Sequence, residues 1–176
     1  MMRIALLALA LVAPLGDDWQ ALHRPLHLPH AGLTCPTSPT RELGQFTWSH
    51  AAPVYLENVG SVPPGEIDVS QSPEYQGRRG QKTPWIVPAS YRGPVLIRGA
   101  RIDGRGSISF AKAFGQHLKE LRYRSGESNG ARIRIAGLPG RYRLLASASS
   151  FRTAGCYAFQ IDGTSFSAVI VMRVKR

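Results

Sequence analysis

Three histidines near the start of the chain, His23, His27 and His30, have the spacing of metal ligands on one face of a helix. Imidazoles arranged in this way can bind Zn²⁺ or Cu²⁺. Pro25 and Pro29 interrupt the helix that this geometry requires, and no cysteine or carboxylate stands at ligand spacing from the histidines. We therefore expect a solvated arm here, without a metal ion or another cofactor.

Catalysis has little support in the sequence. A nucleophile needs a base held beside it, and acid–base catalysis needs paired carboxylates or a histidine of tuned pKa. His117 is the sole histidine in the second half of the chain. Asp103 and Asp162 each precede a glycine, and this pair is typical of turns in which the carboxylate satisfies the backbone. We therefore expect Asp162 and Gly163 to form a turn, and we predict no catalytic residue.

Charge is the compositional feature that most restricts the choice of partner. The chain has 22 Lys and Arg against 11 Asp and Glu, for a net charge of +11. Such a charge favours anionic cell-wall polymers or membrane headgroups, and a solvated basic face set by composition is the alternative. Without a recognised nucleic-acid motif, we expect no nucleic-acid partner. The candidate anion-binding residues are Arg78, Arg79, Lys82, Arg98, Arg101, Arg132 and Arg134.

The first 16 residues have the pattern of an export signal. Arg3 is followed by an unbroken apolar run over 4–12, which is shorter than the roughly 20 residues that span a bilayer. We expect residues 1–16 to be a signal peptide, with an uncleaved anchor or a buried helix as the alternative, and no transmembrane segment afterwards. In a secreted or extracytoplasmic protein of the cell envelope, Cys35 and Cys156 should pair as a disulfide.

The elements that would position these residues are short apolar runs separated by turn residues. Short strands separated by turns in this way predict an antiparallel sandwich or barrel over 46–176. An extended arm over 17–45 is expected to precede it. A helix over 111–123 competes with one of the strands, although Gly115 weakens it. The expected strands are 54–57, 85–87, 95–98, 107–110, 118–123, 131–135, 142–148, 155–161 and 165–174.

Alternation of residue types assigns faces to two of these strands. In 131–135, Arg132 and Arg134 alternate with apolar residues, which predicts a half-buried strand with a basic outer face. The hairpin over 155–174 is apolar on both faces, which predicts a central position in its sheet or a cover by another segment. The arm that carries Cys35 is the natural cover, because a disulfide to Cys156 would hold it there.

The chain resembles a group of uncharacterised exported bacterial proteins in three segments. These segments are Thr-Cys-Pro at 34–36, Tyr-Arg-Gly-Pro-Val-Leu-Ile-Arg-Gly at 91–99 and Gly-Cys-Tyr-Ala-Phe-Gln-Ile-Asp-Gly-Thr at 155–164. The resemblance implies an immunoglobulin-like β-sandwich that is secreted or associated with a membrane. It implies no activity.

Together these features predict an all-β, exported, disulfide-bonded protein with a basic surface. We expect a non-enzymatic binding or envelope-structural role, with anionic cell-wall or membrane-surface polymers as partners. One alternative is an accessory subunit that binds a partner protein of an envelope complex. The other alternative is a hydrolase with an unrecognised site.

Overall fold

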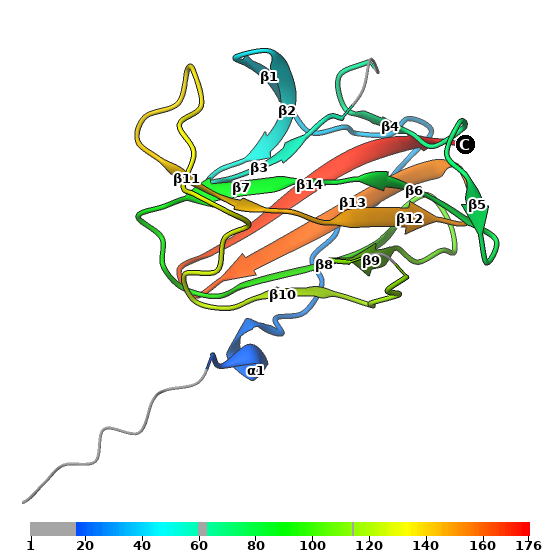
Figure 1. Cartoon of the computed structure of the whole chain (residues 1–176). Coiled ribbons are helices and arrows are strands. Elements are labelled where there is room, and N and C mark those ends of the chain that lie inside the picture. Colours follow the sequence, from blue (N-terminus) through cyan, green and yellow to red (C-terminus); the bar gives the residue numbers. More distant parts are fainter. Residues whose placement is uncertain (1–16, 60–62, 114) are drawn as a thin grey trace, which may run out of the picture.

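β-Strands are the main regular elements of the computed structural model, which describes residues 17–59, 63–113 and 115–176. The expected antiparallel sandwich is found: two layers of strands face each other, and the single helical turn α1, Trp19–Leu22, lies outside them (Figure 1). The expected signal peptide over 1–16 lies outside the described residues. Within the described part of the chain, no helix is long and apolar enough to cross a membrane.

The first sheet has five antiparallel strands in the order β1-β2-β3-β7-β11. Its strands are β1 Thr40–Leu43, β2 Phe46–Ala51, β3 Val54–Glu57, β7 Trp85–Pro88 and β11 Tyr142–Leu145. The boundary that the sequence suggested between arm and sandwich, at residue 46, therefore falls inside the hairpin of β1 and β2.

The second sheet also has five strands, in the order β10-β8-β13-β14-β4. They are β10 Leu121–Tyr123, β8 Val95–Arg101, β13 Gly155–Gly163, β14 Phe166–Lys175 and β4 Glu66–Asp68. All pairs are antiparallel except β14 with β4, which is parallel. The hairpin of β13 and β14 is thus central, as its apolar faces predict.

A third, smaller sheet runs β5-β6-β12-β9. Its strands are β5 Glu74–Tyr75, β6 Arg78–Lys82, β12 Ala148–Phe151 and β9 Ser109–Ala111. The main core draws on all three sheets, and the edge of Trp85 from β7 meets Phe159 from β13 with ring centroids 5.3 Å apart. On β13, Tyr157, Phe159 and Ile161 face this core.

The turn predicted at Asp162 and Gly163 is wrong by two residues. Both positions belong to β13, where Asp162 pairs with Ser167 and Gly163 pairs with Phe166, so the turn consists of Thr164 and Ser165. A Cβ on Gly163 would lie 2.4 Å from the Phe166 ring. Glycine is therefore required for packing at the strand end, and the Asp162 carboxylate is satisfied by side chains rather than by a turn.

Two other expected elements differ. Residues 131–135 form no strand among the described residues, because only Ile133 makes a β-bridge, to Tyr142. Ile133 and Ile135 instead pack over the outer face of the first sheet. The segment 111–123 forms no helix either, since its described residues contribute a bridge from Leu118 to Phe110 and the short strand β10.

Candidate functional site

The predicted anion-binding residues on β8 each pair with a carboxylate of the protein. Arg98 Nη2 lies 2.8 Å from Asp162 Oδ2, and Arg101 Nε lies 2.5 Å from Asp103 Oδ1. The Arg98 side chain is 13% exposed, and Asp162 is fully buried. Both arginines are therefore committed to ion pairs of the fold.

The Asp162 carboxylate is the centre of a buried network that holds the arm. It accepts hydrogen bonds from Arg98, from Gln160 Nε2 at 2.9 Å and from Ser167 Oγ at 2.7 Å, and Arg24 Nη1 of the arm lies 3.4 Å away. Burial alone would raise the pKa of Asp162. The hydrogen bonds from Ser167, Arg98 and Gln160, with the charge of Arg98, outweigh burial and hold the pKa below its usual value.

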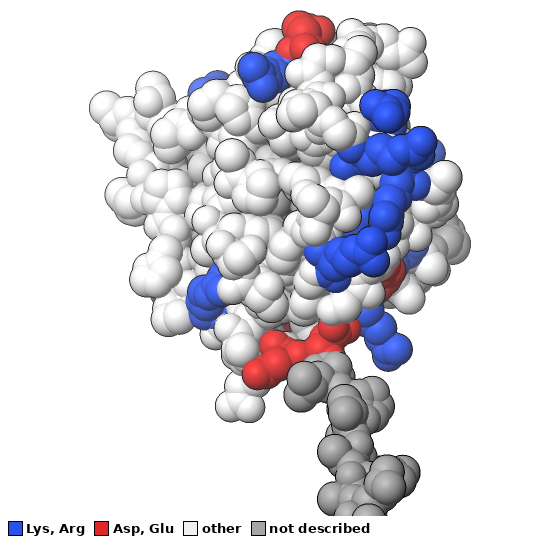
Figure 2. Space-filling model, turned by 90° about the vertical axis from the view of Figure 1, so that its left-hand side faces the viewer, with Lys and Arg blue, Asp and Glu red and all other residues white. Residues whose placement is uncertain are grey.

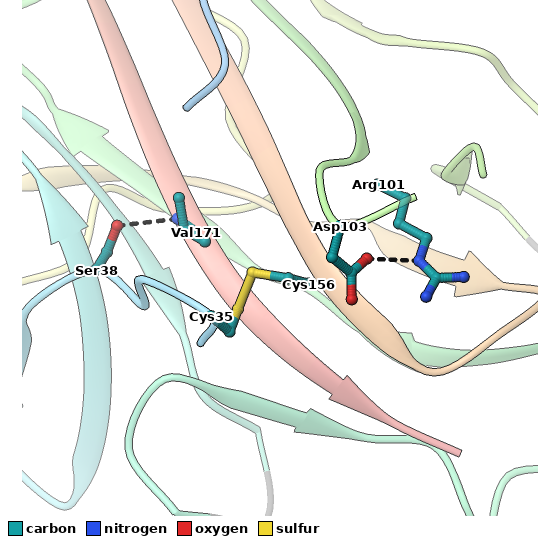
Figure 3. Close-up of a disulfide and its surroundings, with 6 residues drawn as sticks. All are labelled: Cys35, Ser38, Arg101, Asp103, Cys156 and Val171. Atoms are coloured by element: carbon teal, nitrogen blue, oxygen red, sulfur yellow. Dashed lines mark hydrogen bonds and ion pairs between the residues drawn. A yellow bond between two sulfur atoms is a disulfide. The ribbon is translucent and has the colours of Figure 1, made fainter. Parts of the chain in front are cut away.

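Further along, the arm is fixed by a disulfide and by backbone contacts (Figure 3). Cys35 and Cys156 lie in disulfide geometry, with an S–S distance of 1.95 Å. Ser38 N donates to Val171 O, and Val171 N donates to Ser38 Oγ, both at 2.9 Å. Apolar residues of the arm, including Ala31, cover the outer face of the second sheet, so the arm is an integral part of the fold.

Two of the three predicted candidates on β6 also bond within the fold. Arg78 Nη1 donates to Ser107 O and Ser150 O, both at 3.2 Å, and Arg79 donates to Ser70 O. Lys82 is exposed. The seven residues named from the sequence therefore do not form one face.

Arg132 and Arg134 belong to a different concentration of charge at one end of the sandwich. They are exposed on the loop 131–138. Figure 2 views this end and shows a band of basic side chains along one side of it. We call the five exposed arginines on the β7–β8 and β10–β11 loops the basic end: Arg92, Arg124, Arg132, Arg134 and Arg141.

Hydrogen bonds join the loops of the basic end. Gly126 N donates to Arg92 O at 2.8 Å, and Arg141 Nη1 donates to Arg132 O at 3.2 Å. Arg124 lies in the same turn as Gly126. In the described part of the chain, no arginine of the basic end forms an ion pair with a carboxylate. Their charges are therefore not neutralised within the described chain, although Arg141 uses one nitrogen to bond Arg132 O.

Beneath these loops lies Arg143, which the sequence reasoning did not single out. It is fully buried on β11, and it donates to Glu127 O at 2.9 Å, Tyr91 O at 2.9 Å and Gly93 O at 3.0 Å. Burial lowers its pKa. Because its partners are carbonyls of two separate loops, Arg143 fixes those loops to each other. The signal in the sequence is that Arg143 shares a strand face with the buried Leu145.

A groove of about 510 Å³ opens beside the basic end, between the β1–β2 hairpin and the loop 131–138. Its walls are mainly apolar. The polar residues that line it are Gln45, Glu57 and Arg134, and burial raises the pKa of Glu57. Its apolar lining residues are Leu43, Phe46, Trp48, Ile133, Ile135, Ala136 and Leu144.

The geometry around His117 does not assemble a hydrolase site. His117 is exposed, stacks on Tyr75 with ring centroids 5.6 Å apart, and has Nδ1 3.3 Å from Ser109 Oγ. In the chain as described, no carboxylate bonds to this ring, so the orienting group of a catalytic triad is missing.

A second serine stands in a pattern that the sequence reasoning passed over. Ser128 is the centre of Gly126-Glu-Ser-Asn-Gly130, which fits the Gly-x-Ser-x-Gly sequence of hydrolase nucleophiles. That motif works where a strand turns into a helix. Here the five residues lie in the loop between β10 and β11, where no helix follows a strand. The Ser128 hydroxyl lies 3.5 Å from Leu144 O, so we assign this serine a structural role in the loop.

The arm histidines are not brought together. His23 Nε2 lies 3.2 Å from Glu120, and the backbone nitrogen of His27 donates to Gln160 Oε1 at 2.8 Å. Across residues 17–59, 63–113 and 115–176, no group of three side chains is placed to hold a metal ion.

Comparisons with known proteins give no relative for this chain. No family model, no curated protein and no solved structure matches it. Support for a function therefore comes from the basic end and the groove.

Proposed function

We propose that the protein is an exported, immunoglobulin-like binding module without enzymatic activity, and that its basic end binds a linear anionic polymer of the cell envelope. The observation that supports this function is the set of exposed arginines on neighbouring loops whose guanidinium groups have no carboxylate partner in the described chain. Elsewhere in the described chain, Arg98 and Arg101 are paired with acids, while the exposed Arg105 and Arg152 form no ion pair and serve below as controls.

The chemistry of arginine suits this ligand. A guanidinium group binds carboxylate or phosphate through two parallel hydrogen bonds, which gives geometric selectivity as well as charge attraction. The arginines stand on two loops that the hydrogen bond from Gly126 N to Arg92 O joins, so they can meet successive charges of one chain. Arg143 supports the arrangement by fixing the loops on which the other arginines stand.

The test measures binding of the oxidised protein to polygalacturonate, a linear polycarboxylate, at several salt concentrations. The first variant replaces Arg92, Arg132 and Arg141 with glutamine. The matched control replaces Arg105, Arg152 and Arg173, which are exposed outside the loops of the basic end and change the net charge equally.

We expect the first variant to lose most of its binding and most of its salt dependence, while the control stays close to the unmodified protein. Equal weakening of both variants would show that only the overall charge matters, and the proposal would be abandoned. Binding to phosphatidylglycerol vesicles but not to the polymer would reassign the basic end to membrane headgroups.

A further inference from the structure

The groove beside the basic end has the composition of a small-ligand site. Leu43 and Trp48 of the β1–β2 hairpin are 3% exposed and form one wall. Half-buried Ile133 and Ile135 of the loop form the opposite wall. Sites for small molecules are mostly apolar, contain a few polar groups and occupy about 300–1,000 Å³. The groove, with a volume of about 510 Å³, falls within that range.

Part of this apolar surface is open to water. Phe46 stands at the hairpin tip with 43% of its surface exposed, and it is one of four large apolar residues that are exposed among the described residues. It lies beside Trp48, with ring centroids 6.5 Å apart. Covering this surface with an apolar group would remove it from water, which is favourable in proportion to the area covered.

The two aromatic rings indicate the shape of the occupant. Phe46 and Trp48 pack edge to face, with 87° between their planes. They therefore do not offer the two parallel faces that would hold a flat ring between them. The other apolar walls are aliphatic, from Leu43, Leu144 and Ile135, so a flexible alkyl chain suits the groove better than an aromatic ring does.

The charged side chains of the groove indicate which head group the ligand would carry. Arg134 lines the groove from the exposed loop, and Arg132 stands two residues before it on the same loop. The opposing charge is Glu57, which lies on β3 directly across from Trp48 in the strand pair. Among the loop residues that line the groove, Arg134 is the charged one. The loop wall therefore favours an anion.

We propose that this groove binds a long-chain carboxylate, with the alkyl chain between the hairpin and the loop and the carboxylate on Arg134. This site goes beyond the proposed function, because it does not require that the basic end bind a polymer. The two ideas share only the loop 131–138, and separate variants test them.

The experiment is isothermal titration calorimetry of the oxidised protein with laurate below its micelle concentration. Decanoate and octanoate, which have shorter alkyl chains, test whether the affinity depends on the length of that chain. Dodecyl maltoside and dodecyltrimethylammonium test the head, since they keep the chain length but are neutral and cationic. Acetate carries the carboxylate without a long alkyl chain, so it tests the head group alone.

Two variants and one control accompany this series. Ala136→Trp fills the groove from an exposed position, so it blocks the site with little effect on the fold. Arg134→Gln removes the partner of the carboxylate. Arg132→Gln makes the same change of charge on the same loop but does not line the groove. Thermal unfolding of each variant shows that it is folded.

We expect laurate to bind more tightly than the neutral and cationic amphiphiles, with a negative heat-capacity change. Each removal of two methylenes should weaken binding by about tenfold. Ala136→Trp should abolish binding, Arg134→Gln should weaken it, and Arg132→Gln should leave it unchanged. The variant lacking Arg92, Arg132 and Arg141 should still bind laurate even if polymer binding is lost.

Three results would overturn the proposal. The first is laurate binding no tighter than dodecyltrimethylammonium, which would deny the anionic head. The second is binding that Ala136→Trp does not change, which would place the ligand elsewhere. The third is an affinity that does not depend on chain length, which would show that the alkyl chain stays in water.

Discussion

Replacement of Asp162 with asparagine should destabilise the protein more than any other single change of charge considered above. Asparagine keeps the size of the side chain but removes the negative charge beside Arg98 and Arg24. Leaving one partner of a buried ion pair unmatched costs about 3–5 kcal/mol. Arg98 is 13% and Arg24 is 33% exposed, so water screens part of the charge that remains. We therefore expect a loss of about 3 kcal/mol, near the lower limit.

For a chain of this size, that loss corresponds to a melting temperature lower by roughly 6–12 °C. The measurement is denaturant unfolding of the oxidised protein near neutral pH. Asp103→Asn is the matched control, because it breaks the Arg101–Asp103 pair, whose carboxylate side chain is 28% exposed. Exposed pairs contribute about 0–1 kcal/mol. A loss for Asp162→Asn that is no larger than the control's would refute the assignment of a buried, stabilising charge.

The pH dependence of stability provides a second test of the Asp162 network. The pKa of Asp162 is lowered in the folded protein, so the ionised carboxylate stabilises the fold above its unfolded pKa of about 3.9. That contribution is lost as the pH falls through the lower, folded pKa. The difference in stability between the unmodified protein and Asp162→Asn should therefore shrink in acid. A difference that stays constant down to the acid transition would contradict this account.

Three further predictions concern other parts of the fold. Gly99→Ala should destabilise the protein by about 1–3 kcal/mol, because the added Cβ would lie 2.5 Å from Ala158 O; a neutral effect on thermal unfolding would contradict the close approach. Replacing Cys35 and Cys156 with serine should cost about 4–5 kcal/mol in denaturant unfolding, since the disulfide spans 121 residues, and a change below 1 kcal/mol would show that the arm is held without it. Glu57→Gln should raise stability near neutral pH, because burial raises the pKa of Glu57 and disfavours its charge. This advantage should disappear in acid, where Glu57 is protonated. A variant that is less stable near neutral pH would show that the carboxylate has a stabilising partner.

The strands that the sequence predicted well are apolar runs bounded by turn residues, whereas the alternating segment 131–135 forms no strand. β3 was predicted with its exact bounds, and the central hairpin of β13 and β14 to within two residues at each end. The third sheet was largely missed, because β6 reads Arg-Arg-Gly-Gln-Lys and shows no apolar alternation. Its strand conformation depends on pairing with β12, a segment far away in the chain.

Asp162 and Arg143 show why the roles of charged residues were harder to predict. An aspartate before a glycine gives a strong local turn signal. Its true partners, Arg98 and Arg24, are 64 and 138 residues away, where local patterns carry no information. Arg143 stands in a strand that was predicted correctly, but the loop carbonyls that bind it become visible only in the folded chain. Arg132 and Arg134 were expected to be exposed, and they are, although on a loop rather than a strand.

The position of the last hairpin has a consequence for how the protein is made. β8 and β4 are joined only through β13 and β14, which a ribosome synthesises about fifty residues or more after them. Until then, each has an open edge that can pair with another chain. A product cut short before residue 155 would carry these open edges together with an unpartnered Cys35 thiol. Such fragments should aggregate or be degraded, so accumulation of the native protein depends on completion of its final two strands.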